Sequence, residues 1–122
     1  MLGPLRSNVE FAETLIRHLK SPALKAKAQL ISISSKLVLF HANDLLDLSF
    51  LQTGHFSPTF TNGSPSQAII EIVDLVQATL EDENLSIELD IESVAEHYQV
   101  LKFDKRRLQQ VLLNLLSNAV KF

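Results

Sequence analysis

The chain has 122 residues, of which 46% are hydrophobic and 20% charged, and its net charge is −3 at pH 7. This composition is typical of a small globular domain and argues against disorder. The sequence contains no cysteine and only three glycines, which excludes disulfides, zinc–thiolate sites, thiol catalysis and a glycine-rich phosphate loop, and no apolar run approaches the ~20 residues that span a bilayer.

Charge and residue pattern change together near Gly54. Residues 1–52 carry six basic and four acidic side chains, whereas residues 53–122 carry five basic and ten acidic ones. The first part has no strand-like alternation, while the second part contains turn residues, alternation and helix caps. We therefore expect two segments of different architecture, residues 1–53 and residues 54–122.

The first segment is expected to form two helices. Apolar residues at alternating spacings of four and three follow a heptad pattern, first at Leu5, Val9, Ala12, Ile16 and Leu19. Ser21-Pro22 interrupts this pattern, because proline disfavours a helical residue before it and has no amide hydrogen to donate. The pattern resumes at Leu24, Ala28, Ile31, Ser35, Val38, Ala42 and Leu45.

A second apolar stripe runs beside the first on the second helix, at Leu30, Ile33, Leu37 and Phe40. The apolar arc is then too wide for a hairpin of two helices to cover. A homodimer that forms a four-helix bundle would cover it, and so would burial of the helix against its own domain. The pattern alone leaves both interpretations open.

The second segment alternates strand and helix signals in the order β-α-β-β-α, which predicts an α/β sandwich. Residues 56–61 are a candidate edge strand, a position in which Pro58 is tolerated. Ser64 and Gln67 form a capping box with a proline between them, which predicts the start of a helix.

Two further strands and a final helix are expected after this one. Strict alternation over residues 85–92 predicts a strand, and residues 98–103 are its candidate partner. Asp104 is expected to cap the last helix, where its carboxylate meets the positive end of the helix dipole. The predicted buried face of that helix consists of Leu108, Val111, Leu112, Leu115, Ala119 and Phe122.

Another face of the last helix is polar. At ~100° per residue, Gln110, Asn114, Asn118 and Lys121 fall within an arc of about 80°. Amide oxygens can bind Mg²⁺, and an ammonium group can offset phosphate charge. The stripe therefore suits a phosphate-rich ligand with a hard cation, although a solvated polar face has the same pattern.

Two stretches of the sequence match a known family. Residues 104–122 read D-K-R-R-L-Q-Q-V-L-L-N-L-L-S-N-A-V-K-F and closely resemble the N-box of sensor histidine kinases. Residues 43–49 read N-D-L-L-D-L-S, precede Gly54 and Phe56, and resemble the end of the second helix in the dimerisation and histidine-phosphotransfer domain of these kinases. The two matches stand in the family's order at about its spacing, so the resemblance covers nearly the whole chain.

The resemblance implies an α+β fold. Residues 1–53 would form a helical hairpin that dimerises into a four-helix bundle, and residues 54–122 would form the first half of the kinase ATP-binding α/β sandwich. Asn114 and Asn118 match N-box asparagines near Mg²⁺ and the phosphates, and Lys121 matches a basic residue near the phosphates. ATP and Mg²⁺ would be the cofactors of the complete parent protein. Related ATPases that hydrolyse ATP have a glutamate at the position of Asn114, and an amide cannot accept a proton from water, so the asparagine implies phosphoryl transfer.

The family's phosphoacceptor motif is H-E-x-x-x-P-L, and Pro4-Leu5 can fill its last two places. The histidine and glutamate would then precede Met1, so we assign no catalytic residue in this chain. The implied parental reaction is ATP-dependent autophosphorylation of a histidine and relay to a receiver aspartate. We expect the chain alone to be inactive and to bind no cofactor tightly. The alternatives are a non-catalytic dimerisation or interaction module related to histidine kinases, and an unrelated helical adaptor.

The implied partners are a second copy of the chain, bound through the hairpin, and the receiver domain of a response regulator. The Lys105-Arg106-Arg107 cluster lies in a net-acidic segment, which favours a solvated helix turn over a nucleic-acid site. We expect no direct membrane contact and a cytoplasmic location for this segment, whether or not its parent is anchored in a membrane.

Overall fold

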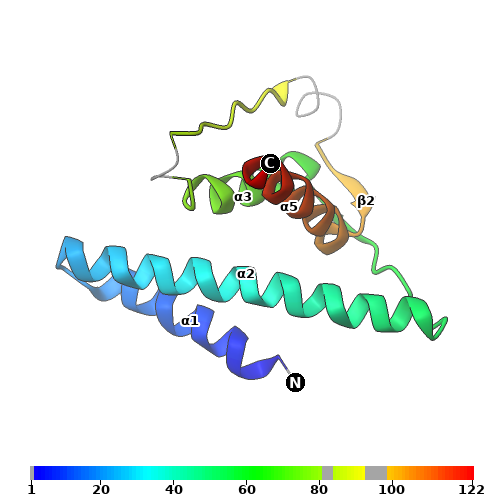
Figure 1. Ribbon diagram of the computed structural model, residues 1–122, viewed down its shortest axis with the longest axis horizontal. Helices are drawn as coiled ribbons and strands as arrows, with labels where there is room; N and C mark the ends of the chain where they lie inside the picture. The colour runs from blue at the N-terminus through cyan, green and yellow to red at the C-terminus, as the bar shows by residue number, and fades with distance from the viewer. Residues whose placement is uncertain (1, 81–83, 93–98) are drawn as a thin grey trace. The chain divides into compact units, whose positions relative to one another are not determined.

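The structure is a computed structural model that describes residues 2–80, 84–92 and 99–122. The chain forms two compact units, one ending at Phe56 and the other beginning at Ser57. The first unit is helical, and the second combines helices with a small antiparallel sheet (Figure 1). A helical hairpin followed by a partial α/β unit is therefore confirmed, while the assignment of the two units to dimerisation and ATP-binding domains stays a prediction.

The first unit is an antiparallel helical hairpin made of α1 (Gly3–His18) and α2 (Pro22–Gln52) (Figure 1). The predicted break is confirmed, because α1 ends before Ser21 and α2 begins with Pro22 at its first position. The Ser21 hydroxyl caps α2 by accepting a hydrogen bond from the backbone N–H of Leu24 at 3.5 Å. After α2 the chain turns at Gly54, whose φ of +71° favours a residue without a side chain.

The interior of the hairpin contains small side chains. Ala12 of α1 and Ala28 of α2 are only 2% and 3% exposed, and Ser32, one turn after Ala28, is also buried. The rest of the predicted α1 stripe is half-buried, namely Leu5, Val9, Ile16 and Leu19. An ion pair of 2.8 Å between Glu13 and Lys36 links the two helices at their partly exposed edge, where such pairs contribute ~0–1 kcal/mol.

The predicted apolar stripe of α2 divides between two sides of the helix. Ala28 is buried, but Leu24, Ile31, Val38 and Leu45 are 51%, 53%, 48% and 70% exposed. These four residues recur at every seventh position. The fold of one chain therefore leaves this part of the heptad pattern uncovered.

The second unit contains β1 (Thr61–Gly63), α3 (Pro65–Gln77), β2 (Leu101–Phe103) and α5 (Lys105–Lys121). The two strands pair antiparallel, with Asn62 opposite Lys102. The prediction of a strand over residues 56–61 is wrong except at its last residue. Pro58 has no N–H, and the N–H of Thr59 donates to the Asp104 carboxylate at 2.7 Å, so this stretch lacks donors for a sheet ladder.

The strand predicted over residues 85–92 is also wrong. Residues 85–91 are irregular, and the N–H of Ile87 donates to the side-chain oxygen of Gln77 at 3.2 Å instead of to a strand. Their expected partner, β2, pairs with β1, and Tyr98, at the start of that expected partner, lies outside the described residues. The alternation of apolar and polar residues thus did not determine whether this stretch pairs with another strand.

Both predicted helix caps are confirmed. The Ser64 hydroxyl accepts from the N–H of Gln67 at 3.2 Å and begins α3. The Asp104 carboxylate accepts from the N–H of Arg107 at 3.2 Å and begins α5. Between the two helices lies the apolar core of the unit, which contains Ala68, Ile72, Val76, Leu80 and Leu113.

The predicted buried face of α5 is wrong in part, because only Leu108 and Leu112 of its six residues are half-buried. Val111, Leu115 and Phe122 are 56%, 62% and 95% exposed, whereas Leu113 and the polar Gln109 are buried. The side chain of Gln109 binds α3 through hydrogen bonds, and this contact turns the edge of α5 that carries Gln109 and Leu113 toward the core. Val111, Leu115 and Phe122, which were expected to be buried, consequently lie on another side.

Replacement of Asp104 by Ala should destabilise the second unit by about 1–2 kcal/mol, because it removes the α5 cap and the anchor of Thr59 together. Ser64→Ala is the matched control, since it removes a cap of the same type from α3 without a long-range hydrogen bond and should cost about 1 kcal/mol. Amide hydrogen exchange along α3 and α5 measures both losses. Equal losses would show that the bond to Thr59 does not stabilise the unit.

Candidate functional site

The polar stripe lies on one continuous helix. Helix α5 extends over all four of its positions, and Asn114, Asn118 and Lys121 are exposed while Gln110 is half-buried. The Lys121 ammonium lies 5.6 Å from the centre of the Phe122 ring, a distance at which a cation and an aromatic face attract each other. The stripe therefore presents two amide groups and one ammonium group to solvent.

Helix α5 has three distinct sides. At ~100° per residue, Asn114 and Asn118 lie about 140° and 180° from Gln109, and Val111 and Leu115 lie about 200° and 240° from it. The first side packs on the core, the second carries the polar stripe, and the third is apolar and exposed. The exposed apolar side is continuous with the polar stripe, so a ligand or further chain could contact both at once.

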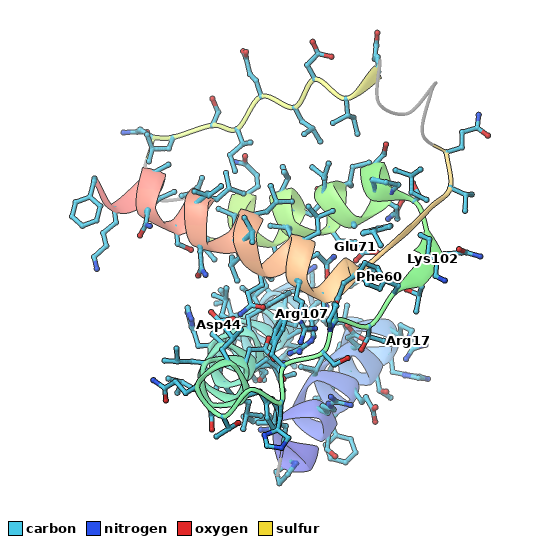
Figure 2. All side chains as sticks on the ribbon, turned by 90° about the vertical axis from the view of Figure 1, so that its right-hand side faces the viewer. Arg17, Asp44, Phe60, Glu71, Lys102 and Arg107 are labelled. Atoms are coloured by element: carbon cyan, nitrogen blue, oxygen red, sulfur yellow. The ribbon has the colours of Figure 1, made fainter. Side chains whose placement is uncertain are left out.

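A polar cluster fixes α5 to α3 at the side opposite the stripe. The Gln109 amide donates to the backbone carbonyl of Ala68 at 3.1 Å and to the Glu71 carboxylate at 2.8 Å. Lys105, one turn before Gln109, forms an ion pair with the same carboxylate at 2.8 Å. Figure 2 shows Glu71 on α3 beside the start of α5. Because the Gln109 side chain is buried with its amide bonded to both groups, rotation of α5 would break buried hydrogen bonds.

The electrostatics of this cluster favour an ionised carboxylate. Burial alone would raise the pKa of Glu71, but hydrogen bonds from Lys105 and Gln109, together with the Lys105 charge, hold the pKa below its ordinary value. The cluster thus keeps the Glu71 carboxylate negatively charged, the form that accepts hydrogen bonds from both Lys105 and Gln109.

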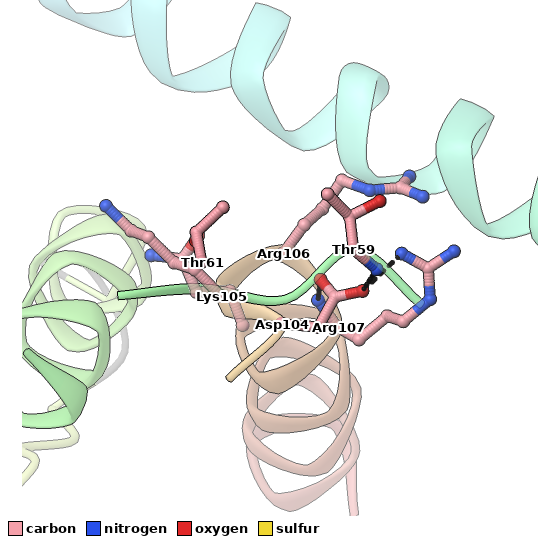
Figure 3. Close-up of a pocket in the computed structure, with 7 residues that line it drawn as sticks. Thr59, Thr61, Asp104, Lys105, Arg106 and Arg107 are labelled. Carbon is pink, nitrogen blue, oxygen red and sulfur yellow. Dashed lines mark hydrogen bonds and ion pairs between the residues drawn. The ribbon is translucent and has the colours of Figure 1, made fainter. Parts of the chain in front are cut away.

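The N-terminal end of α5 borders an open pocket (Figure 3). Its lining comes from β1, the chain before it and the first turn of α5, and includes Thr59, Thr61, Asp104 and Lys105. Burial alone would raise the pKa of Asp104, but hydrogen bonds from the backbone of Thr59 and Arg107, together with the Arg107 charge, hold it below its ordinary value. The Asp104 carboxylate already occupies the end of the helix, so the pocket offers no free N-terminus to an anion.

No group of acidic and histidine side chains that could hold a metal ion occurs in the described parts of the chain. A cation at the polar stripe would therefore depend on the amide oxygens of Asn114 and Asn118. The sequence pattern indicated these two residues but not the cluster of Glu71, Lys105 and Gln109. Glu71 precedes Gln109 by 38 residues, and no local spacing indicates that they meet.

Acidification should destabilise the second unit through Glu71 and Asp104. A carboxyl whose pKa is lower in the folded state stabilises the fold above its unfolded pKa, here near the ordinary values of 4.5 and 3.8. That contribution is lost as the pH falls through the lowered folded pKa. The double variant Glu71→Gln/Asp104→Asn should therefore lose less stability than the parent chain between about pH 5 and pH 3. Urea midpoints across this range measure the difference, and parallel pH profiles would refute the role of these two groups.

Comparisons with known proteins connect this geometry to a family. No family model and no solved structure match the chain. It is 31% identical, over 98% of its length, to the non-motile and phage-resistance protein of Caulobacter vibrioides, and 30% identical, over the same share, to the circadian input-output histidine kinase CikA of Synechococcus elongatus. It is 37% identical, over 75% of its length, to the cell-division control histidine kinase PdhS of Brucella canis.

The chain spans only 14%, 16% and 9% of the lengths of these three proteins, respectively. The similarity to two named histidine kinases nevertheless covers most of the chain, in agreement with the resemblance found in residues 43–49 and 104–122. The chain belongs to the histidine kinase family and is homologous to a short part of its longer members.

Proposed function

We propose that the chain is the dimerisation hairpin and N-box segment of a sensor histidine kinase. In this proposal the parent protein phosphorylates a histidine with ATP and relays the phosphoryl group to the aspartate of a receiver domain. The observation that carries the proposal is the exposed stripe of Asn114, Asn118 and Lys121 on a helix that is anchored by its opposite side. Homology to named histidine kinases supports the same assignment.

The donor groups of the stripe fit Mg²⁺ and a triphosphate chemically. Amide oxygens are hard ligands of the type that Mg²⁺ takes, and the lysine ammonium is a compact charge suited to phosphate. ATP would supply the phosphoryl group. Asn114 and Asn118 would hold the cation, and Lys121 would offset phosphate charge. None of these three side chains accepts a proton from water at neutral pH, so the set favours transfer of the phosphoryl group over hydrolysis.

The hairpin supports a dimer. Phe11 and Leu15 of α1 are 67% and 50% exposed, and they lie about 80° around α1 from the buried Ala12. The exposed heptad residues of α2, which recur at every seventh position from Leu24 to Leu45, lie about 70° around α2 from the buried Ala28. Viewed along each helix from its N-terminus, the rotation away from the buried alanine has the same direction in α1 and α2. Because the helices are antiparallel, both sets face the same side of the hairpin. A second copy would cover this side and complete a four-helix bundle.

A receiver domain would be the partner in phosphotransfer, and the segment would reside in the cytoplasm. None of the helices in the described residues, including the long α2, is apolar enough over sufficient length to cross a membrane.

A second candidate function is a non-catalytic interaction module that pairs with related kinases. The exposed heptad stripe favours this candidate, because it lies wholly within the hairpin and needs no nucleotide site. The two candidates share the dimer and differ in nucleotide binding by the parent protein. Tight binding of Mg·ATP at the stripe would exclude the second candidate, whereas no binding by this chain alone is expected of both.

Replacement of Val38 or Leu45 by Asp should dissociate the dimer, because each carboxylate would be buried without a partner at a cost of several kcal/mol. Sedimentation at micromolar concentration measures the change, with a dimer for the parent chain and a 13.7 kDa monomer for each variant. Gln29→Asp adds the same charge on another side of α2 and should leave the dimer intact. A parent chain that sediments only as a monomer would disprove the dimer.

The chain of 122 residues should show no saturable binding of Mg·ATP below ~1 mM, equivalent to about 4 kcal/mol. Two amides and one ammonium on an exposed helix compete poorly with water, and measurable affinity usually requires a concave pocket. Calorimetric titration measures this, with Asn118→Ala as the control. Tight binding that Asn118→Ala abolishes would show that the stripe is a complete site in this chain, while tight binding that survives this change would place the nucleotide elsewhere.

A further inference from the structure

The charges of the first unit are segregated along the chain. Residues 17–27 contain Arg17, Lys20, Lys25 and Lys27, and no acidic residue occurs anywhere in residues 14–43. The residues outside 17–27 include seven basic and fourteen acidic ones. We name these four cations the basic tip, because the segment forms the closed end of the hairpin, where α1 ends and α2 begins (Figure 1).

All four cations of the basic tip are exposed. No ion pair is found for any of the four among the described residues, whereas Lys36, Lys105 and Arg107 each pair with a carboxylate. Arg17 donates only a long bond of 3.4 Å from its Nε to the backbone carbonyl of Glu13, and its side chain is visible in Figure 2. The charge of the tip is therefore available to a partner.

The fold itself does not require this charge. Arg17 stands in the last turn of α1, where a cation offsets the helix dipole. Lys20 lies between the helices, and Lys25 and Lys27 follow the positive end of α2, which has no acidic residue in its first turn. Lys25 and Lys27 thus gain nothing from the dipole of α2, and mutual repulsion among the four cations, which lie within eleven residues, disfavours their clustering.

We propose that the basic tip is a docking surface for an acidic protein partner, whose clustered carboxylates contact the end of the hairpin. The four cations come from the end of α1, the connection between the helices and the start of α2, so they match a compact acidic surface that receives this end of the hairpin. Carboxylates would form charge-assisted hydrogen bonds with the ammonium and guanidinium groups. This surface is independent of the polar stripe on α5 and of the apolar side of the hairpin.

The chemistry of the tip favours a protein over a nucleic acid or a membrane. The end of the hairpin carries no phenylalanine, tyrosine or tryptophan ring on which a base could stack, and the exposed ring of His18 is hydrogen-bonded through its Nδ1 to the backbone carbonyl of Thr14. The acidic excess of the remaining chain repels a long polyanion. Its outermost residues, Ser21, Pro22 and Ala23, are exposed but small. Leu24 is the one large apolar side chain exposed within residues 17–27, and a single such side chain buries too little apolar area to hold the tip in a bilayer. A compact acidic protein surface requires neither feature.

Titration of the isotope-labelled chain with short poly-L-glutamate tests the proposal. We expect chemical-shift changes confined to residues 15–28, and weaker binding as salt is added, because exposed charge pairs are screened. The double variant Lys25→Glu/Lys27→Glu should bind at least tenfold more weakly, equivalent to about 1.4 kcal/mol. Circular dichroism shows whether this variant retains its helices.

The matched control is Arg6→Glu/Lys102→Glu, which makes the same change in net charge at exposed positions outside the tip and should retain the affinity of the parent chain. Equal weakening of both double variants, or shifts spread over other basic residues, would overturn the proposal by showing a response to net charge alone. The same titration with a DNA duplex or with phosphatidylserine vesicles tests the choice of a protein partner. Chemical-shift changes in residues 15–28 at a charge concentration equal to or lower than that of poly-L-glutamate would overturn this choice.

Discussion

The buried side chain of Gln109 determines how the second unit is put together. Its amide binds both the Ala68 carbonyl and the Glu71 carboxylate, and a buried amide deprived of these partners would be destabilising by ~1–3 kcal/mol. The apolar contacts of α5 are compatible with more than one rotation about its axis, since leucine or valine occurs on several sides of this helix. The polar contact is compatible with one rotation. It therefore selects which side of α5 is buried and leaves Asn114 and Asn118 exposed.

The elements that depend on local chemistry were predictable from the sequence. Ser64 and Asp104 cap their helices as expected, and Pro22 begins α2, because each acts within one helical turn. The strand at residues 85–92 and most of the buried face of α5 were predicted wrongly, because they depend on contacts between distant parts of the chain. Periodicity gave no reason to place Gln109 inside, since a glutamine on an amphipathic helix usually faces solvent. Its partner Glu71 could be identified only from the fold.

In the candidate site too, local features were predictable from the sequence and contacts between distant residues were not. The sequence located the polar stripe and, through the family resemblance, assigned it a role toward Mg²⁺ and phosphate. What holds the stripe in place, namely the cluster of Glu71, Lys105 and Gln109, came from the structure alone. In the hairpin, the heptad pattern predicted the helices and an excess of apolar surface, but only the fold separated the buried Ala28 from the exposed Val38 and Leu45. That separation assigns one side of α2 to α1 and another to a second copy in the proposed dimer.

The orientation of α5 is the claim on which the site and the proposed function both depend. Paramagnetic relaxation by a soluble nitroxide, read at each residue of α5, measures it directly. The structure predicts strong relaxation at the side chains of Val111, Asn114 and Leu115, and protection of those of Gln109 and Leu113. Protection of Val111 and Leu115 with strong relaxation at Gln109 would contradict this orientation, and with it the placement of the polar stripe.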